Sequence, residues 1–354
     1  ELGCASGDNL VGMAIGLPGA AFAGVDFSER QVEAGRRRVA ELGLANVDLR
    51  VGDLRDLDEG WGAYDYVVAH GVLSWVAEPV RGRLLEVCRE RLAPRGVAFV
   101  SWNALPGWRF RRLVRDVLLA GASGAEAPGE RVRRARERLA LVAANVFEPE
   151  GPWGRFLAER AEEVAGESDA YVLHDFLEPE NEAFSIRDVA ARAREAGLDY
   201  LCDAQEPWVP EEPLSPELRR ALDAIPDPLE REELLDVLRE RSLRQGLYVR
   251  ADRPVSAVAA VALHAAARPE SDAPGSGATP VGAAADAVPA AALGALHAAW
   301  PATLPVSELA NGSAEELVRS LASLQREGRA ELRTVPLSCG APLSARPRAR
   351  ARAR

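Results

Sequence analysis

Glu1-Leu2-Gly3-Cys4-Ala5-Ser6-Gly7 is the stretch of this 354-residue chain that best indicates its fold. Its pattern predicts the end of a β-strand, a turn made on glycine and the start of a helix. Gly3 and Gly7 leave room for a ligand to approach the backbone, because glycine carries no Cβ atom. The N–H groups at the start of the helix favour an anionic group at the same place. The stretch therefore predicts a ligand-binding turn in a nucleotide-type α/β sheet.

A carboxylate follows the glycine turn at the separation expected of a ribose-binding residue. Asp26 ends the apolar run Ala21–Val25, and it lies about 20 residues beyond the turn, where such folds hydrogen-bond a ribose diol. Dinucleotide loops have the spacing G-x-G-x-x-G, and their middle glycine lets a pyrophosphate approach. Here the spacing is Gly3-x-x-x-Gly7 preceded by Glu1. The absent middle glycine argues against a dinucleotide.

Two further predicted strands end in polar residues. Val47–Val51 alternates as a strand and runs into Gly52-Asp53-Leu54. Asp53 is a second candidate for ligand binding, with loop capping as the alternative. Tyr64–His70 predicts a continuous buried strand, which places His70 at the edge where ligands bind in open α/β sheets. His70 could accept a proton, line the ligand or cap the strand, and the sequence leaves these roles open.

The neighbouring segments predict helices and turns that would complete the sheet. Ser28–Leu42 predicts an amphipathic helix, and Gln31 completes an S-x-x-Q capping box rather than contacting the ligand. Glu78–Leu92 predicts another helix. The chain then predicts a turn at Pro94–Gly96, a strand over Val97–Trp102 and a rigid loop over Asn103–Trp108.

Composition restricts the class of protein. The chain is 47% hydrophobic and long enough for two or three domains. Its four cysteines lack the spacing of a metal site, which indicates reduced thiols, a cytoplasmic setting and no bound metal. No apolar run has the length of a membrane span. The net charge of −11 argues against a nucleic-acid partner. Every basic residue is arginine, so the protein cannot modify its own lysines.

The position of the glycine turn also carries an expectation about the chain itself. In a doubly wound sheet, the strand before this turn is central and pairs on both sides. No such strand precedes Glu1 in the sequence. We therefore expect the sequence to be an N-terminally truncated fragment.

Four stretches resemble one bacterial family. These are VDFSERQ (25–31), YDYVVAHGVLSWV (64–76), LAPRGVAFVSWNALPGW (92–108) and YVLHDFLEPENEAF (171–184). They are similar to class I S-adenosylmethionine-dependent methyltransferases that carry a methyltransferase regulatory domain. That group includes the rickettsial protein-lysine methyltransferases that act on outer-membrane proteins. The resemblance covers roughly residues 1 to 250, and it departs from the family at Trp102, where tyrosine is usual, and at Leu105, where an aromatic residue is usual.

The resemblance implies S-adenosylmethionine as the cofactor and a Rossmann-like class I methyltransferase sheet. The helical run between the fifth and sixth predicted strands predicts a helical insertion, and three predicted helices followed by a short apolar run predict a small winged-helix-like C-terminal domain. The implied cofactor-binding residues are Glu1, Gly3, Gly7, Asp26, Asp53, Leu54 and His70. The residues expected at the reacting centre are His70, Trp75, Asn103 and Trp108. The tryptophans Trp75, Trp102 and Trp108 end or follow the predicted strands, and they could supply rings that desolvate an amine, although at least one of them is better explained by core packing.

The expected domains follow the composition and the resemblance. They are a cofactor-binding core at 1–108, a helical regulatory insertion at 109–183, the rest of the core at 184–252, a helix and linker at 253–282, a winged-helix-like domain at 283–336 and an arginine-rich tail at 337–354. The insertion would lie over the cofactor edge as a lid or substrate platform. Its loop 174–181 carries His174 and several acids that could face the site.

Three functions are compatible with these residues. The first is methyl transfer to protein lysine side chains, and the second is transfer to a small molecule. The third is a cofactor-binding interaction protein without turnover. The N/D-P-P-Y/F motif that is typical of methylation on exocyclic or amide nitrogens does not follow the fourth strand. A protein or small-molecule acceptor is therefore expected rather than DNA, and a homodimer is compatible with the sequence.

Overall fold

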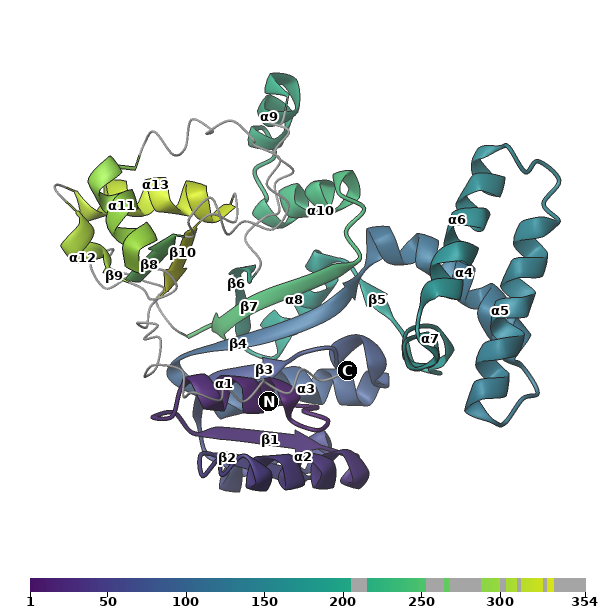
Figure 1. Cartoon of the computed structure of the whole chain (residues 1–354), viewed down its shortest axis with the longest axis horizontal. Coiled ribbons are helices and arrows are strands. Elements are labelled where there is room, and N and C mark those ends of the chain that lie inside the picture. Colours follow the sequence, from purple (N-terminus) through teal and green to yellow (C-terminus); the bar gives the residue numbers. More distant parts are fainter. Residues whose placement is uncertain are drawn as a thin grey trace. The chain divides into compact units, whose positions relative to one another are not determined.

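The chain forms two compact units, each with its own hydrophobic core. The first unit contains residues 1–204 and 218–253, and the second contains 205–217 and 254–354. Figure 1 shows the elements of both units in a computed structural model. The structure describes residues 1–204, 215–252, 264–267, 288–299, 304–310, 313–326 and 330–333.

A parallel pair of strands follows the glycine turn in the first unit. Its elements in order are α1 (Asp8–Gly16), β1 (Phe22–Asp26), α2 (Glu29–Glu41) and β2 (Val47–Val51). Ser28 is the N-cap of α2, because its side chain accepts a hydrogen bond from the N–H of Gln31. The predicted strand over 47–51 is confirmed.

The larger sheet has the strand order β3-β4-β7-β6, and β5 pairs with the end of β4. Its strands are β3 (Tyr64–Ala69), β4 (Leu92–Ala104), β5 (Ala183–Phe184), β6 (Leu198–Asp203) and β7 (Leu243–Arg250). β7 is antiparallel to both β4 and β6. Leu2 joins the two sheets, because its N–H donates to the carbonyl of Val68 at 2.7 Å and it forms a parallel bridge with Val25.

Helices α3 (Glu78–Arg91) and α8 (Ile186–Glu195) pack against the larger sheet and against each other. The core between these helices and the sheet includes Leu84, Val100 and Tyr248, all fully buried. Two shorter helices, α9 (Pro216–Asp223) and α10 (Pro228–Leu238), precede β7. The core therefore lies between these two helices and the sheet that carries the site.

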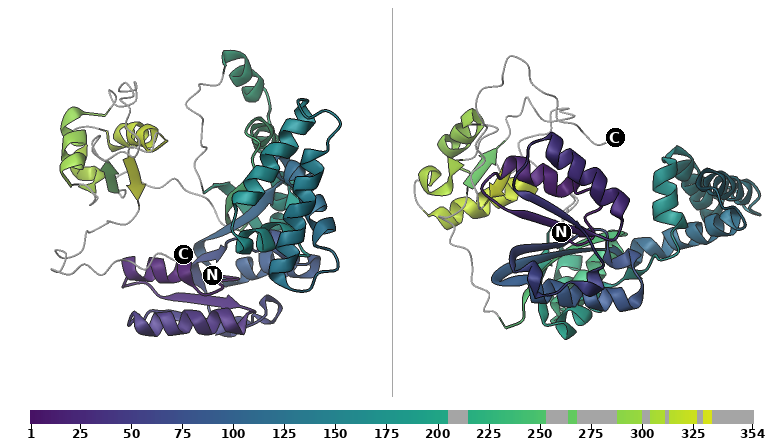
Figure 2. Two further views of the ribbon diagram at one scale, coloured as in Figure 1. Left: turned by 45° about the vertical axis from the view of Figure 1, so that its right-hand side comes forward. Right: turned by 90° about the horizontal axis from the view of Figure 1, so that it is seen from below.

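Between β4 and β5 the chain forms a helical insertion with a core of its own. Its helices are α4 (Leu105–Ala122), α5 (Pro128–Ala144), α6 (Pro152–Gly166) and α7 (Asp169–Leu177). Leu118, Leu139 and Val172 are among the side chains that are fully or almost fully buried there. Figures 1 and 2 show these helices grouped to one side of the sheet, with α4 continuing directly from β4.

The strand predictions for β3 and β4 were wrong in two places. The expected turn at 94–96 lies inside β4, and the register between β3 and β4 shifts there, so a bulge takes the place of a turn. The expected burial of β3 is also incomplete, because Tyr66 is 71% exposed. Tyr66 lines an open cleft between β3 and β1 instead of lying inside the core.

Two predicted loops are helical. The expected loop over 103–108 is the start of α4, and Pro106 lies in the first turn of that helix, where a missing backbone N–H costs nothing. The expected loop over 174–181 begins inside α7, which ends at Leu177. Pro106 is compatible both with a loop and with the first turn of a helix, so the residues around it do not distinguish the two.

In its described residues, the second unit contains a small antiparallel sheet with the strand order β10-β8-β9 and three helices. Its elements are β8 (His264–Ala267), α11 (Ala290–Ala299), β9 (Leu304–Pro305), α12 (Val306–Leu309), α13 (Ala314–Arg326) and β10 (Ala330–Arg333). These helices lie inside the range 283–336 predicted for the winged-helix-like domain. β8 corrects the expectation of helix and linker at 253–282, because it pairs with β10. The predicted linker 268–282 and tail 337–354 lie outside the described residues.

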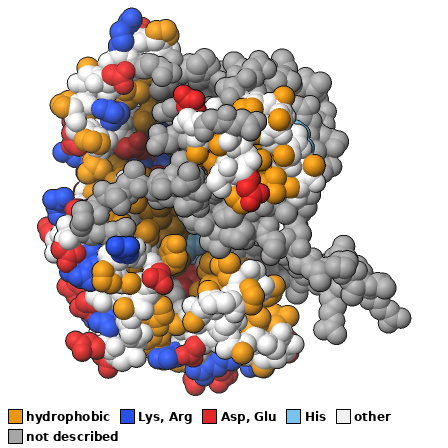
Figure 3. All heavy atoms as spheres, turned by 90° about the vertical axis from the view of Figure 1, so that its left-hand side faces the viewer, with side chains coloured by type: hydrophobic (Ala, Val, Ile, Leu, Met, Phe, Trp, Pro, Cys, Tyr) orange, Lys and Arg blue, Asp and Glu red, His pale blue; other side chains and the backbone are white. Residues whose placement is uncertain are grey.

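The face shown in Figure 3 carries a hydrophobic patch in its lower part, where the chain passes from α1 to β1 and from α2 to β2. A shallow hollow there is lined by residues that include Ile15, Pro18 and Leu42. This patch lies at the opposite end of the strands from the glycine turn. Among the described helices, none combines the length and the apolar character that crossing a membrane requires.

Candidate active site

The glycine turn has a backbone that only glycine adopts easily. Gly3 and Gly7 have φ angles of +68° and +69°. A Cβ atom on Gly3 would lie 2.6 Å from Cγ2 of Val72, and one on Gly7 would lie 2.9 Å from the side chain of Leu49. Gly7 is also the N-cap of α1, and no side chain caps the first N–H groups of that helix. These N–H groups are therefore available to an anionic part of a ligand.

Asp26 holds the glycine turn in place from the end of β1. Its Oδ2 accepts a hydrogen bond from the N–H of Ala5 at 2.8 Å, and its Oδ1 accepts one from the N–H of Ser28 at 2.8 Å. The first bond stabilises Ala5 in a left-handed conformation with φ +47°, which alanine rarely adopts. Each carboxylate oxygen has a second lone pair. Asp26 can thus support the turn and accept hydrogen bonds from a ligand at the same time.

Asp53 and Leu54 follow β2, as predicted, but their side chains have local partners. Asp53 caps a short 3₁₀ turn by accepting from the N–H of Arg55 at 2.9 Å, and it pairs with the guanidinium of Arg55 at 2.6 Å. These hydrogen bonds lower the pKa of the Asp53 carboxyl below its ordinary value. Leu54 is buried in the core. Only the backbone of Leu54 could contact a ligand. Both carboxylate oxygens of Asp53 accept hydrogen bonds from Arg55, so a ligand would share them with that residue.

Glu1 and His70 lie near the ends of the central strands. The Glu1 carboxylate accepts a hydrogen bond from Nδ2 of Asn9 at 3.2 Å. Burial raises the pKa of the Glu1 carboxyl above its ordinary value, and the bond from Asn9 opposes this effect. His70 is exposed directly after β3, and its ring meets Phe99 edge to face at 5.7 Å. One side of the His70 ring is therefore packed while the residue stays accessible at the edge of the sheet.

Trp75 and Trp108 come together beside the end of β4. Trp75 ends a 3₁₀ turn at Leu73–Trp75, and its ring meets that of Trp108 on α4 edge to face at 6.2 Å. His174 on α7 stacks on Trp75, with the ring centres 4.5 Å apart and an angle of 24° between the planes. Trp102, in contrast, is 1% exposed and belongs to the core. Of the three predicted tryptophans, Trp75 and Trp108 therefore share a site with His174.

Asn103 connects the core to the helical insertion. Its backbone N–H donates to Oγ of Ser74 at 2.8 Å, and its Nδ2 donates to Oδ1 of Asn181 at 3.2 Å. Asn103 is 6% exposed. The side-chain amide that was expected to act on a substrate is thus engaged by the segment that follows α7.

Arg111 is a residue that the sequence analysis missed. It lies on α4, and its guanidinium packs over the ring of Trp108 at 5.2 Å and donates to Oη of Tyr171 at 2.7 Å. It also pairs with the carboxylate of Asp175 at 3.6 Å. The spacing of Trp108 and Arg111 on one helix face could have indicated this contact, if 105–122 had been predicted as a helix.

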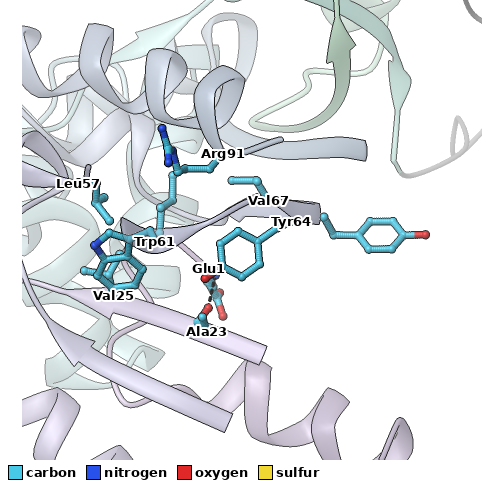
Figure 4. Close-up of a pocket in the computed structure, with 10 residues that line it drawn as sticks. Glu1, Ala23, Val25, Leu57, Trp61, Tyr64, Val67 and Arg91 are labelled. Atoms are coloured by element: carbon cyan, nitrogen blue, oxygen red, sulfur yellow. Dashed lines mark hydrogen bonds between the residues drawn. The ribbon is translucent and has the colours of Figure 1, made fainter. Parts of the chain in front are cut away.

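A separate small cleft lies between β1 and β3, with a volume of about 30 Å³. Figure 4 shows Glu1 in this cleft, with Ala23 on one side and the rings of Trp61 and Tyr64 on the other. The cleft is lined by the first halves of the strands, and none of Gly3, Asp26 and His70 is among its lining residues. It is therefore separate from the glycine turn, although Glu1 belongs both to this cleft and to the candidate cofactor residues. In the described part of the chain, no group of three histidine, cysteine or carboxylate side chains could hold a metal ion.

Two family models match this chain. A methyltransferase domain matches residues 1–98, and a predicted methyltransferase regulatory domain matches residues 168–250. Two uncharacterized proteins of Rickettsia prowazekii are each 33% identical to the chain, one over 72% of this chain and 46% of its own length, the other over 50% and 71%. The chain belongs to the S-adenosylmethionine-dependent methyltransferases. It thus spans about half the length of the first of these relatives.

A solved structure confirms the fold of this methyltransferase. PKMT2 from Rickettsia typhi superposes with a TM-score of 0.74 at 24% sequence identity, over 94% of this chain and 70% of that chain. The structure of PKMT2 in complex with AdoHcy superposes with a TM-score of 0.73. The Rossmann-like class I methyltransferase sheet with its helical insertion is therefore the architecture of this chain.

The residues at the glycine turn fit S-adenosylmethionine, the cofactor of this family. The uncapped start of α1 suits a carboxylate, and the spare lone pairs of Asp26 suit the two ribose hydroxyls. Nothing lies within 4 Å of a Cβ position on Gly71, directly after His70. The edge of the sheet is thus open at the point where a cofactor would pass from β1 to β3.

Proposed function

We propose that this methyltransferase transfers a methyl group from S-adenosylmethionine to lysine side chains of other proteins. The observation that carries the proposal is the position of Val72, which packs on Gly3 of the cofactor turn and leads directly into Trp75. The donor site is thereby adjacent to a group of aromatic rings suited to a long cationic side chain. The resemblance to rickettsial protein-lysine methyltransferases supports this acceptor, as does the similarity in fold to PKMT2.

Residues of the glycine turn and of the strand ends hold the donor. When bound, S-adenosylmethionine supplies a methyl group carried on a positively charged sulfur. Asp26 accepts hydrogen bonds from the ribose hydroxyls, and the start of α1 holds the carboxylate. We assign further contacts to Glu1, to the side chain of Asp53, to the backbone of Leu54 and to His70.

The aromatic residues prepare the acceptor. A lysine amine has an ordinary pKa of about 10.4, and only its neutral form has a free lone pair. Burial against apolar rings disfavours the charged form and so lowers the pKa of the amine. Trp75 is half-buried and Trp108 is buried, so together they exclude water from one side of the acceptor. The protein then contributes mainly alignment and the exclusion of water.

The first test is calorimetric binding of S-adenosylmethionine to the full chain. Asp26→Ala removes the acceptor of the ribose bonds, and we expect at least a hundredfold weaker binding, because about two charge-assisted hydrogen bonds are lost. Asp26→Asn keeps one acceptor oxygen and should bind at an intermediate affinity. Asp48→Ala is the matched control, because Asp48 lies on β2 and pairs with Arg50 away from the turn. Equal binding by all four proteins would refute the donor site.

The second test identifies the acceptor. The protein is incubated with tritiated S-adenosylmethionine and total bacterial protein, and acid hydrolysates are analysed for methylated amino acids. The chain contains no lysine, so labelled methyllysine can only come from another protein. Methyllysine above the Asp26→Ala level supports the proposal. Label confined to small molecules would instead indicate a metabolite acceptor. Binding without any transfer would indicate a cofactor-binding protein without turnover.

We also place this reaction in the bacterial cytoplasm. Cys4 and Cys88 are buried free thiols, which is the state that a reducing compartment maintains. Alkylation of the protein as isolated under nitrogen from its native host, followed by mass spectrometry, tests the assignment. Disulfide-linked cysteine peptides in that sample would contradict it.

A further inference from the structure

The ring of Trp75 is enclosed by residues from two later parts of the chain. His174 on α7 stacks on one face of it, and Trp108 on α4 meets it edge to face. Trp75 itself lies in the methyltransferase domain, just beyond β3. The half-buried indole and the exposed imidazole therefore form one aromatic wall, although about 100 residues separate them in the sequence.

A short segment fixes His174 in this position. Glu182 donates its backbone N–H to the carbonyl of Ser74 at 2.8 Å, next to Trp75. Residues 183–184 then pair with the end of β4. On the other side, Arg115 donates to the carbonyls of Glu178 and Pro179, and Arg131 donates to that of Leu177 at 2.8 Å. The segment after α7 is thus held at its start by arginine side chains of α4 and α5, and at its end by backbone hydrogen bonds to Ser74 and β4.

The same wall is connected to the donor site. Val72 faces Gly3 so closely that a Cβ atom on that glycine would lie 2.6 Å from Cγ2 of Val72. The carbonyl of Val72 accepts the N–H of Trp75 at 2.9 Å. One tight turn therefore separates the cofactor turn from the aromatic wall.

We propose that His174 binds the methyl acceptor, so that the regulatory domain supplies part of the active site. This inference rests on the proposed function, because His174 would contact the side of the lysine that the methyltransferase domain alone leaves uncovered. The stacked Trp75 and His174 rings offer an apolar surface for the methylene stem of a lysine and a π face that binds its ammonium on arrival. The amine then loses its proton before methyl transfer, because only the neutral form has a free lone pair. Asp175 does not supply the attraction, because Arg111 pairs with its carboxylate.

The probe for this site is hexalysine, titrated calorimetrically into the full chain in the presence of S-adenosylhomocysteine. We expect His174→Ala to weaken hexalysine binding about tenfold, as the loss of one cation–π contact and its packing implies. His174→Phe keeps the stacked ring and should bind within twofold of the native protein. Phe147→Ala is the control on the same domain, because Phe147 is fully exposed. Unchanged affinity for S-adenosylhomocysteine verifies that each variant is folded.

The outcomes separate this inference from the proposed function. Equal hexalysine binding by the native protein and His174→Ala would overturn the inference, and so would an absence of hexalysine binding to the native protein. Labelled methyllysine in bacterial protein would preserve the proposed function in both cases. Hexalysine binding that depends on His174, without methyl transfer to any lysine, would instead contradict the proposed function and leave the binding site standing.

Discussion

Cys4 lies inside the glycine turn, and its surroundings suppress its reactivity. Burial and the nearby carboxylate of Asp26 raise the pKa of the Cys4 thiol to about 12. Burial alone raises the pKa of Cys88 to about 12. Because only a thiolate attacks an electrophile, both groups should be inert at neutral pH in the folded protein.

We expect iodoacetamide at pH 8 to label Cys202, which is exposed, and to leave Cys4 and Cys88 unmodified until the chain unfolds. Peptide mapping by mass spectrometry checks this. An unfolded cysteine loses its proton near pH 8.5, whereas these two keep theirs to about 12. The unfolded chain therefore binds fewer protons in that window, and the free energy of unfolding should fall as the pH rises through it. Rapid labelling of Cys4 in the native protein would contradict this.

Individual residues also show which parts of the site short-range sequence spacing can predict. The positions of Gly3, Gly7 and Asp26 followed from short-range spacing, because the turn and the strand after it are adjacent along the chain. The contact of Trp75 with His174 had no such signal, since it depends on how the insertion packs on the core. The predicted role of Asn103 at the reacting centre assumed a free side-chain amide, but Asn181 occupies that amide.

Helices and strands with a clear hydrophobic periodicity were predicted in the right places, whereas the residues at which they begin and end were predicted less well. The buried strand pairs and α3 were predicted within a few residues. Proline caused the errors at 94–96 and 103–108, because it is compatible both with a break and with a bulge or the first turn of a helix. β8 gave no signal, because its short alanine-rich sequence becomes a strand only by pairing with distant β10.

The segment after α7 gives a prediction about Arg115, which holds it from α4. Arg115→Met keeps most of the side-chain volume and removes the hydrogen bonds to the carbonyls of Glu178 and Pro179. We expect a loss of about 1.5–3 kcal/mol locally, the usual contribution of hydrogen bonds to a charged group. Hydrogen exchange at the Glu182 amide should accelerate at least tenfold, because this amide bonds Ser74 at the far end of the segment.

Arg133→Met is the control for this measurement. Arg133 is 55% exposed and pairs with Glu130 and Glu137 on its own helix, α5. Its removal should leave the exchange of the Glu182 amide unchanged. Binding of S-adenosylmethionine should survive in both variants, since neither arginine lies at the glycine turn. Unaltered exchange in Arg115→Met would show that β5 alone fixes the segment.

At the scale of the whole molecule, two units with separate cores should unfold separately. Leu321 is fully buried in the core of the second unit, and Leu84 is fully buried in the core under the sheet. Truncation of either leucine to alanine should cost about 2–5 kcal/mol. We expect Leu321→Ala to lower only the calorimetric transition of the second unit and to leave S-adenosylmethionine binding intact.

Leu84→Ala should have the complementary effect. It should lower the transition of the unit that carries the glycine turn, and bound S-adenosylmethionine should raise that same transition by mass action. The transition that responds to the cofactor is thereby identified with the first unit. A single transition that shifts in both variants would show that the two units unfold together.

The pairing of β4 with β7 has a consequence for synthesis of the protein. Ala98 on β4 pairs with Tyr248 on β7, and these hydrogen bonds close a loop of the chain that contains the whole helical insertion as one block. As the chain leaves the ribosome, the edge of β4 stays open until the block has emerged, and open strand edges are prone to aggregation. The entropy of closing such a loop grows only slowly with its length, by about 0.6 kcal/mol per doubling. The block can therefore gain or lose helices in evolution at little thermodynamic cost, while each added residue lengthens the time for which the nascent sheet is exposed.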